Sequence, residues 1–250
     1  YFSCVVILSI VVMHIEDTHT FIFVLNRVVD TLIGVFLALI VNSVHLPRGK
    51  NTDVLYVSGI EDVMLTGEEL LTDYSKVELN RIIDTGANFT VATIRTPASV
   101  MESLSDIHLK LPIIAMDGAV LYDLKDNRYL KTYSMSYNKA QKIIEILREE
   151  DVNFFINVVV EDVLIIYYHH LENEAETQIY KQMRKSPHRN YVRRNLPEGE
   201  EVAYFMMVDQ TEKIQKIYER LKVKIHSQEY KMLCYASKDY PGYSYIKIYD

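Results

Sequence analysis

The sequence has few cysteines and no excess of positively charged residues. The two cysteines, Cys4 and Cys234, lie far apart, so we expect neither a disulfide framework nor a metal site built on cysteine pairs. The formal net charge is -7 at pH 7, and no basic stripe of the kind that binds nucleic acid runs along the chain. Positive residues do cluster between positions 184 and 194, but acidic residues flank them on both sides, which favours a solvated surface and no nucleic-acid partner.

The N-terminal part of the chain is far more apolar than the rest. Residues 1–13 are apolar almost throughout, and residues 21–46 have the pattern of a long helix whose centre, residues 31–41, carries no charge. A helix that spans a bilayer needs about 20 apolar residues. We therefore expect two transmembrane helices, the first of them incomplete, in a chain that is a fragment at both ends. A secretory signal is disfavoured because a basic start and a cleavage site are missing.

Two charged residues, Arg27 and Asp30, lie near the start of the second predicted span. They are three positions apart, so they share a helix face and can pair. Charged groups in membrane helices usually face a bundle interior or a cavity, but both residues could equally lie in the headgroup layer. The basic residues Arg48 and Lys50 follow the span and predict a cell-membrane protein with its C-terminal domain in the cytoplasm.

From residue 51 onwards the pattern is that of an α/β domain. Apolar runs typical of strands alternate with spacings typical of helices, and this order favours a parallel sheet with right-handed crossovers. The expected strands are residues 54–57, 89–93, 111–116 and 119–122, and the expected helices are residues 72–85 and 98–105. The first strand, expected to be buried, breaks at Ser58 and Gly59 into a loop with Glu61 and Asp62. Ligands in such folds bind beyond the carboxyl ends of the strands.

A second α+β region is expected between residues 131 and 238. Its predicted helices are residues 138–149, 172–185 and 211–221, and its predicted strands are residues 154–160, 163–168, 202–208, 223–226 and 232–236. A last strand, residues 243–249, is expected to return to the first sheet. No metal site is predicted, because the adjacent His169 and His170 on a strand would point to opposite faces.

The loop after the first strand resembles the first motif of the haloacid dehalogenase (HAD) superfamily, an apolar strand followed by Asp-x-Asp-Gly-Thr-Leu-Leu. In the best register Gly59 takes the position of the nucleophilic aspartate and Glu61 that of the second aspartate, the general acid/base. A shift by one residue places Ser58 on the nucleophile and fits less well. The resemblance also makes Ser58, Gly59 and Asp62 candidate ligand-binding residues.

Two further segments resemble motifs of this superfamily. Thr93 matches the threonine or serine that holds the phosphoryl group, and Arg95 matches a basic residue that often follows it. Asp117 and Gly118 resemble the Asn-Gly-Ala turn of the Cof-type sub-group, with Asp in place of Asn. Each also has a structural alternative: a turn residue for Thr93, a surface ion pair for Arg95 and a turn former for Asp117.

These resemblances imply a HAD-like parallel-sheet core, residues 51–130 completed by residues 239–250, with an inserted type-2 α+β cap at residues 131–238. The run from Arg27 to Gly34, Arg-x-x-Asp-Thr-Leu-Ile-Gly, resembles the last helices of the FUSC and aromatic-acid-exporter membrane families. The predicted third part is therefore a FUSC-like membrane region at residues 1–47.

HAD phosphatases form an aspartyl phosphate with the help of Mg²⁺, and Gly59 has no side chain that could attack phosphorus. We therefore expect a transporter-like membrane protein with a cytoplasmic, catalytically degenerate HAD-like module that uses no cofactor. Its expected partners are the lipid membrane, a small phosphorylated or anionic ligand, and further copies through the membrane part. The alternatives are a membrane-tethered, Mg²⁺-dependent phosphatase of small metabolites and a structural domain without a ligand.

Overall fold

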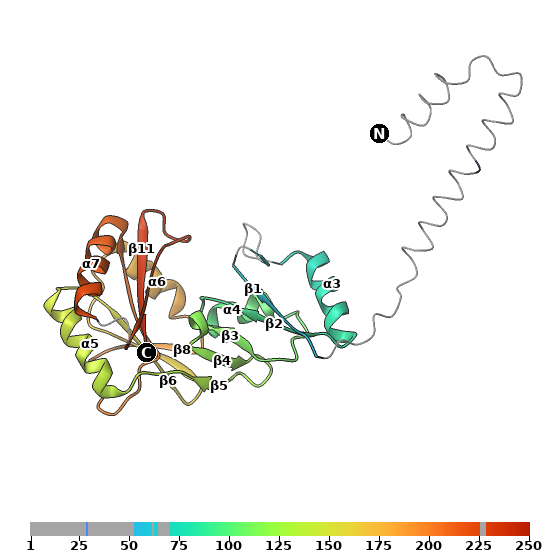
Figure 1. Cartoon of the computed structure of the whole chain (residues 1–250), viewed down its shortest axis with the longest axis horizontal. Helices are drawn as coiled ribbons and strands as arrows, with labels where there is room; N and C mark the ends of the chain where they lie inside the picture. The colour runs from blue at the N-terminus through green and yellow to red at the C-terminus, as the bar shows by residue number, and fades with distance from the viewer. Residues whose placement is uncertain (1–28, 30–52, 62, 65–70, 226–228) are drawn as a thin grey trace, which may run out of the picture. The chain divides into compact units, whose positions relative to one another are not determined.

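The computed structural model describes residue 29 and residues 53–61, 63–64, 71–225 and 229–250 (Figure 1). The chain divides into two units, residues 1–49 and residues 50–250, and the fold below is that of the second unit. Both predicted membrane segments, with Arg27 and Asp30, lie outside the described residues except for Val29. Among the described helices, none has the length and apolar character needed to cross a bilayer.

The first sheet has five strands in the order β1-β2-β3-β4-β5. The first three run parallel, and β4 and β5 are antiparallel to their neighbours. The helix α3 connects β1 to β2, and α4 with a loop connects β2 to β3, as the alternating pattern predicts. The bounds are β1 Leu55–Gly59, α3 Asp73–Asp84, β2 Asn88–Ala92, α4 Pro97–Leu104, β3 Ile113–Ala115, the 3₁₀ turn η1 Met116–Gly118, β4 Val120–Asp123 and β5 Arg128–Thr132.

The second sheet has six strands in the order β10-β11-β9-β6-β7-β8, antiparallel except for the pair β7 and β8. The elements follow one another along the chain as α5 Tyr137–Glu149, β6 Phe155–Val160, β7 Val163–Tyr168, α6 Glu174–Met183, β8 Arg189–Arg193, β9 Tyr204–Gln210, α7 Thr211–Lys224, β10 Lys231–Ala236 and β11 Tyr243–Tyr249.

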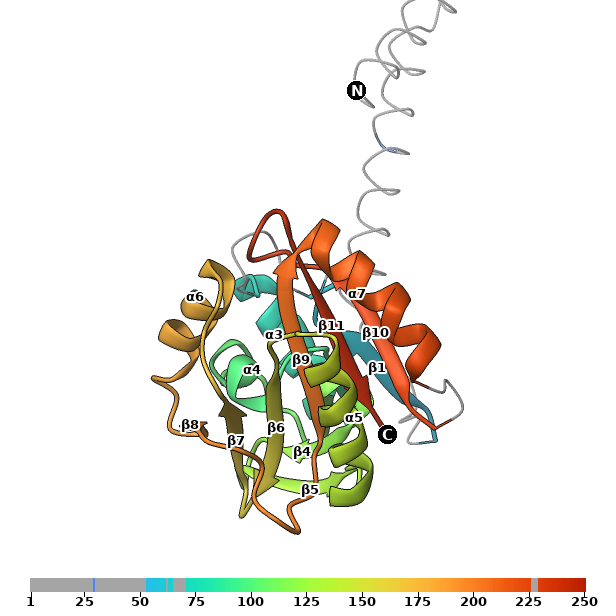
Figure 2. The ribbon, with the colours of Figure 1, turned by 90° about the vertical axis from the view of Figure 1, so that its left-hand side faces the viewer.

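The two faces of this second sheet pack against different partners. Phe205 of β9 and Ile248 of β11 belong to a hydrophobic core shared with α5 and α7, and Figure 2 shows both helices on that face. The neighbouring residues Tyr204 and Tyr249 point to the opposite face, because successive strand residues alternate. They join the core that includes Val91 and Ile113 of the first sheet. The second sheet therefore lies between two helices and the first sheet (Figure 1).

Several predictions about the elements are wrong. β11 does not return to the first sheet; it pairs with β9 and β10 in the second. Residues 223–224, predicted as part of a strand, continue α7, because Ile217 and Leu221 keep a buried helical face while Val223 is exposed. The strands β5 and β8 were not predicted, because charged residues interrupt the alternation of apolar and polar residues that is typical of a strand.

β1 also differs from the prediction of a buried strand. It is an edge strand that pairs with β2 alone among the described strands. Val54, Leu55, Tyr56 and Val57 are 37–56% exposed. A short apolar run predicts a strand, but the run does not contain the information that decides which neighbours cover it.

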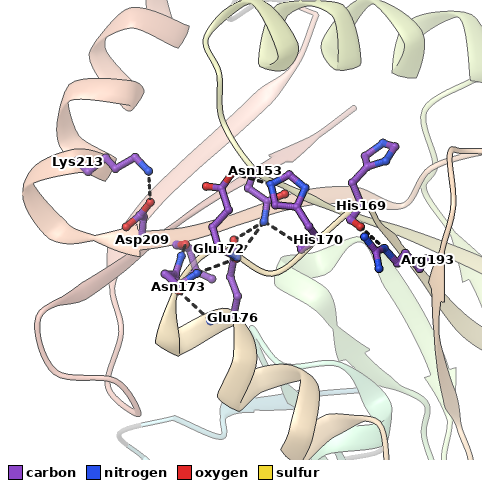
Figure 3. A network of polar contacts seen from close by, with 10 residues as sticks. Asn153, His169, His170, Glu172, Asn173, Glu176, Arg193, Asp209 and Lys213 are labelled. Carbon is purple, nitrogen blue, oxygen red and sulfur yellow. Dashed lines mark hydrogen bonds and ion pairs between the residues drawn. The ribbon is translucent and has the colours of Figure 1, made fainter.

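A polar network fixes the start of α6 (Figure 3). The Asn173 side chain accepts a bond from the Glu176 backbone N–H, and the Glu176 carboxylate accepts bonds from the backbone N–H groups of Asn173 and Glu172. Asn153, from the loop before β6, donates to the same carboxylate at 2.9 Å. This reciprocal capping satisfies helix donors that would otherwise be buried without partners.

Glu176→Ala should lower the free energy of unfolding by about 1–3 kcal/mol, because Asn153 and two backbone donors lose their acceptor. Glu176→Gln should lose less, since one oxygen remains. Burial raises the pKa of Glu176, so the native state holds this proton more tightly than the unfolded chain. The associated stability is present at acidic pH and is lost as pH rises through the native pKa.

Urea unfolding at several pH values measures both effects. The matched control is Glu174→Ala, which removes the same type of residue from the same turn of α6 at a position where the side chain is exposed. Equal losses for Glu174→Ala and Glu176→Ala would show that the buried network does not stabilise this helix.

Candidate active site

Glu61 and Thr93 lie together at the carboxyl ends of the adjacent parallel strands β1 and β2. The register pairs Gly59 with Ala92, and the Ile60 N–H donates to the Ala92 carbonyl at 3.1 Å. The Thr93 hydroxyl donates to Glu61 Oε1 at 2.5 Å. Thr93 is buried and the Glu61 side chain is largely so. The structure thus brings together two residues that the sequence predicted for one site.

Arg95 completes this cluster. Its backbone N–H donates to the Thr93 hydroxyl at 3.1 Å, and its Nε lies 3.7 Å from Glu61 Oε1. The same carboxylate oxygen is therefore approached by a hydroxyl and by a guanidinium. A threonine and a basic residue of this kind are groups that bind a phosphoryl oxygen, and here they contact the protein's own carboxylate.

Gly59, which the motif resemblance aligns with the nucleophile, has room for a side chain. A Cβ placed on Gly59 would meet the Glu61 carbonyl oxygen at 3.7 Å and Val63 Cγ2 at 3.8 Å, which are ordinary contacts. The hydroxyl of Ser58 donates to the Gly59 carbonyl at 3.2 Å, a bond within its own strand. Asp62, the remaining candidate in this loop, lies outside the described residues.

Asp117 is held beside Thr93 by the backbone of η1. The Asp117 N–H donates to the Thr93 carbonyl at 3.3 Å, and the Met116 N–H donates to the Arg95 carbonyl at 3.0 Å. Asp117 has a φ of 57° and Gly118 a φ of 93°. A Cβ on Gly118 would meet nothing within 4 Å, so the left-handed backbone, which favours glycine, is what requires this residue.

Two further residues of the site, Lys247 and Tyr249 of β11, were not predicted from the sequence. Lys247 Nζ donates to Asp117 Oδ2 at 2.7 Å and to the Ile94 carbonyl at 2.9 Å. The Tyr249 hydroxyl donates to the same Asp117 oxygen at 2.6 Å. Alternation in β11 was the available signal, because Lys247 interrupts a row of tyrosines on one face of the strand.

Burial dominates the electrostatics of this pair. The side chains of Lys247 and Asp117 are 7% and 8% exposed, and the ammonium lies 5.5 Å from the ring centre of Tyr204 and 5.4 Å from that of Tyr235. Burial lowers the pKa of Lys247, while the charge and hydrogen bond of Asp117 oppose that shift. Burial likewise raises the pKa of the Tyr249 hydroxyl strongly, so the tyrosine remains a donor.

The donor set at this site does not fit a magnesium ion. Magnesium prefers carboxylate oxygens in octahedral geometry. Here the first acidic position is Gly59, while the carboxylates of Glu61 and Asp117 contact the cations Arg95 and Lys247. No group of three His, Cys, Asp or Glu side chains suited to a metal occurs among the described residues.

Comparisons with known proteins identify the fold. Residues 58–240 match the model of a family described as haloacid dehalogenase-like hydrolase. The chain is 33% identical over 72 residues to a Mycoplasma pneumoniae protein described as a "Putative phosphatase". That stretch covers 28% of this chain and 25% of the relative, so it spans about a quarter of the relative's length.

Solved structures with this fold have low sequence identity. A HAD-like hydrolase from Bacteroides thetaiotaomicron has 12% identity and a TM-score of 0.57, covering 78% of this chain and 70% of its own. One from B. subtilis has 13% identity and a TM-score of 0.58, covering 78% and 73%. A Plasmodium vivax protein described as HAD/COF-like has 12% identity and a TM-score of 0.55, covering 77% and 67%. Such identities show the fold alone.

The family match covers more than half of the 250 residues and includes Gly59, Glu61, Thr93, Arg95 and Asp117. The chain therefore belongs to the haloacid dehalogenase-like hydrolase family, and its fold is that of the Cof-type members.

Proposed function

We propose that residues 50–250 form a HAD-fold module that does not hydrolyse phosphate esters. The observation that carries this proposal is the glycine at position 59. Nucleophilic catalysis in this family needs a carboxylate that attacks phosphorus, and Gly59 offers only hydrogen. A Cβ would fit at this position, so the backbone does not require glycine. In this proposal the fold is intact and only the attacking carboxylate is missing.

Of the carboxylates near Gly59 that the structure describes, neither is placed to replace the nucleophile. Glu61 is engaged by the Thr93 hydroxyl and Arg95, and Asp117 is engaged by Lys247 and Tyr249. Each would have to give up a cation or a short hydrogen bond before it could attack. A displacement of about 1 Å from productive geometry can cost about a hundredfold in rate.

In the function that we propose, the module binds a small phosphorylated or anionic ligand, or docks to a partner, and so regulates a membrane region at residues 1–47. Support for the membrane region comes from the apolar sequence and from the FUSC-like run that starts at Arg27 and contains Asp30. The proposed location is the cell membrane with the module in the cytoplasm. Copies would associate through the membrane part, without nucleic acid.

A second candidate function is a membrane-tethered, Mg²⁺-dependent phosphatase of small metabolites. The contact between Glu61 and Thr93 at 2.5 Å favours it, because it places a carboxylate beside the residue that resembles the phosphoryl-binding threonine. The description of the Mycoplasma pneumoniae relative agrees with this candidate. In such an enzyme Glu61 would serve as the reacting carboxylate or as the acid/base.

The two functions predict different behaviour with p-nitrophenyl phosphate and Mg²⁺. We expect the full chain to show only background hydrolysis, unchanged in Glu61→Ala, because both described carboxylates near Gly59 are bonded to other groups of the protein. Gly59→Asp, which the backbone accommodates, supplies a carboxylate at that position, and turnover in this variant alone would show that the lack of a nucleophile limits the reaction. Magnesium-dependent hydrolysis by the wild type that disappears in Glu61→Ala, but not in the exposed control Glu102→Ala, would establish the phosphatase instead.

Lys247→Met should lower the free energy of unfolding by about 3–5 kcal/mol, because it leaves the Asp117 carboxylate buried without its cation. The double variant Lys247→Met/Asp117→Asn should recover part of that loss, which urea unfolding measures. The control is Lys76→Met, which removes an ion pair of the same length, 2.7 Å, with an exposed Asp106. Similar losses for Lys76→Met and Lys247→Met would contradict a special role for the buried pair.

Membrane fractionation tests the proposed location. The full chain should remain in the membrane pellet after a carbonate wash, because the apolar segments at residues 1–13 and 21–46 hold it in the bilayer. A variant that lacks residues 1–47 should move to the supernatant. Recovery of the full chain in the carbonate supernatant would contradict a membrane-embedded segment.

A further inference from the structure

Arg189 is the one member of the positive cluster at positions 184–194 that does not behave as a surface residue. The sequence favours a solvated face for the whole cluster, and Arg184, Arg193 and Arg194 are indeed exposed. Arg189, at the start of β8, is only 4% exposed. Its guanidinium therefore has to find its partners inside the protein.

The partners that it finds are neutral. Arg189 Nη2 donates to the Thr96 and Ser99 hydroxyls, each at 2.7 Å. Arg189 Nε is buried and has no hydrogen-bond partner. In the part of the chain that the structure describes, no carboxylate forms an ion pair with this guanidinium. A buried charge is normally paired with an opposite charge. The described surroundings of Arg189 do not supply that negative charge.

The helix beside Arg189 adds to this imbalance. Thr96 is the N-cap of α4, whose first helical residue is Pro97, and the Thr96 side chain accepts no bond from the helix backbone. The start of a helix carries a partial positive charge; at α4 this is the dipole alone, because Pro97 has no N–H and the Ser99 N–H donates to the Thr96 carbonyl at 2.9 Å. A guanidinium and a helix N-terminus therefore face the same place with the same sign of charge, and a bound anion would satisfy both.

The hydroxyl groups leave a donor free for such an anion. Thr96 Oγ1 and Ser99 Oγ lie 3.0 Å apart, so one of their two protons is used between them. The other proton has only the sulfur of Met183, at 4.0 Å from Ser99 Oγ. The Tyr191 hydroxyl also interacts with Arg189. Burial raises the pKa of Tyr191 to about 12, and the charge and hydrogen bond of Arg189 oppose that rise. Hydroxyls and a guanidinium beside the positive end of a helix are together a donor set for an oxyanion.

We propose that Arg189, Thr96, Ser99 and the N-terminus of α4 bind a tetrahedral oxyanion, either inorganic phosphate or the phosphate group of a small metabolite. The site is distinct from the cluster of Glu61 and Thr93. Its residues come from β8 of the second sheet and from the segment between β2 and the first turn of α4, and none of them contacts Gly59. It therefore stands whether or not the module hydrolyses phosphate esters.

The test is a titration of the full chain with inorganic phosphate at constant ionic strength, followed by calorimetry and by thermal unfolding, with chloride as the reference anion. At about 100 times the Kd, linkage should raise the Tm by roughly 5–10 °C for a domain of this size. Arg189→Met should weaken binding at least about tenfold. Arg194→Met, the same change at an exposed neighbour, should bind like the wild type.

Two more variants locate the site and guard against misfolding. Thr93→Val compares the two clusters: loss of phosphate binding in this variant, with binding intact in Arg189→Met, would place the anion beside Glu61 and overturn the proposal. If Arg189→Met does not fold, the Thr96→Val/Ser99→Ala double variant decides, and wild-type affinity there would overturn it. No saturable response of the wild type to phosphate would do the same. A phosphate monoester tested alongside distinguishes the two sources, because a metabolite site should prefer it.

Discussion

The buried ion pair of Lys247 and Asp117 is the contact that fixes the candidate site between the two sheets. It joins β11 of the second sheet to the turn after β3 of the first, at 2.7 Å and almost without solvent. A lysine removed from water is costly unless a carboxylate and further acceptors surround it, and Asp117 and the Ile94 carbonyl supply them. Each partner therefore requires the other while the sheets are packed together, since loss of either one would leave a buried charge without compensation.

A single loop receives both buried cations of the second sheet. Lys247 bonds to the Ile94 carbonyl, and Arg189 bonds to Thr96 and Ser99, all between the end of β2 and the first turn of α4. The same loop carries Thr93 and Arg95. Polar contacts thus fix the position of the residues at which a ligand would bind, whereas the apolar core beneath them fixes only the packing of the layers.

The alternating pattern predicted the α/β order, and the resemblance to HAD motifs assigned Glu61, Thr93 and Asp117 to one site, in agreement with strand ends that meet at one edge of a parallel sheet. The predictions failed where the answer depends on pairing between distant segments. The apolar pattern of residues 243–249 predicts a strand, but only the surrounding elements decide that it joins β9 and β10. Arg189 was predicted among surface charges for the same reason, as burial of one arginine in a basic run has no local signature.

Two glycines of the site show the difference between a residue that the fold requires and one that it merely accepts. Gly118 has a φ of 93°, so a side chain there would be strained although nothing blocks it. Gly59 has neither a positive φ nor a close neighbour. The backbone at position 59 would accept an aspartate as well as a glycine. Beside it, the Glu61 carboxylate accepts a hydrogen bond from the Thr93 hydroxyl and lies 3.7 Å from Arg95, so these two donors already face a negative group of the protein itself.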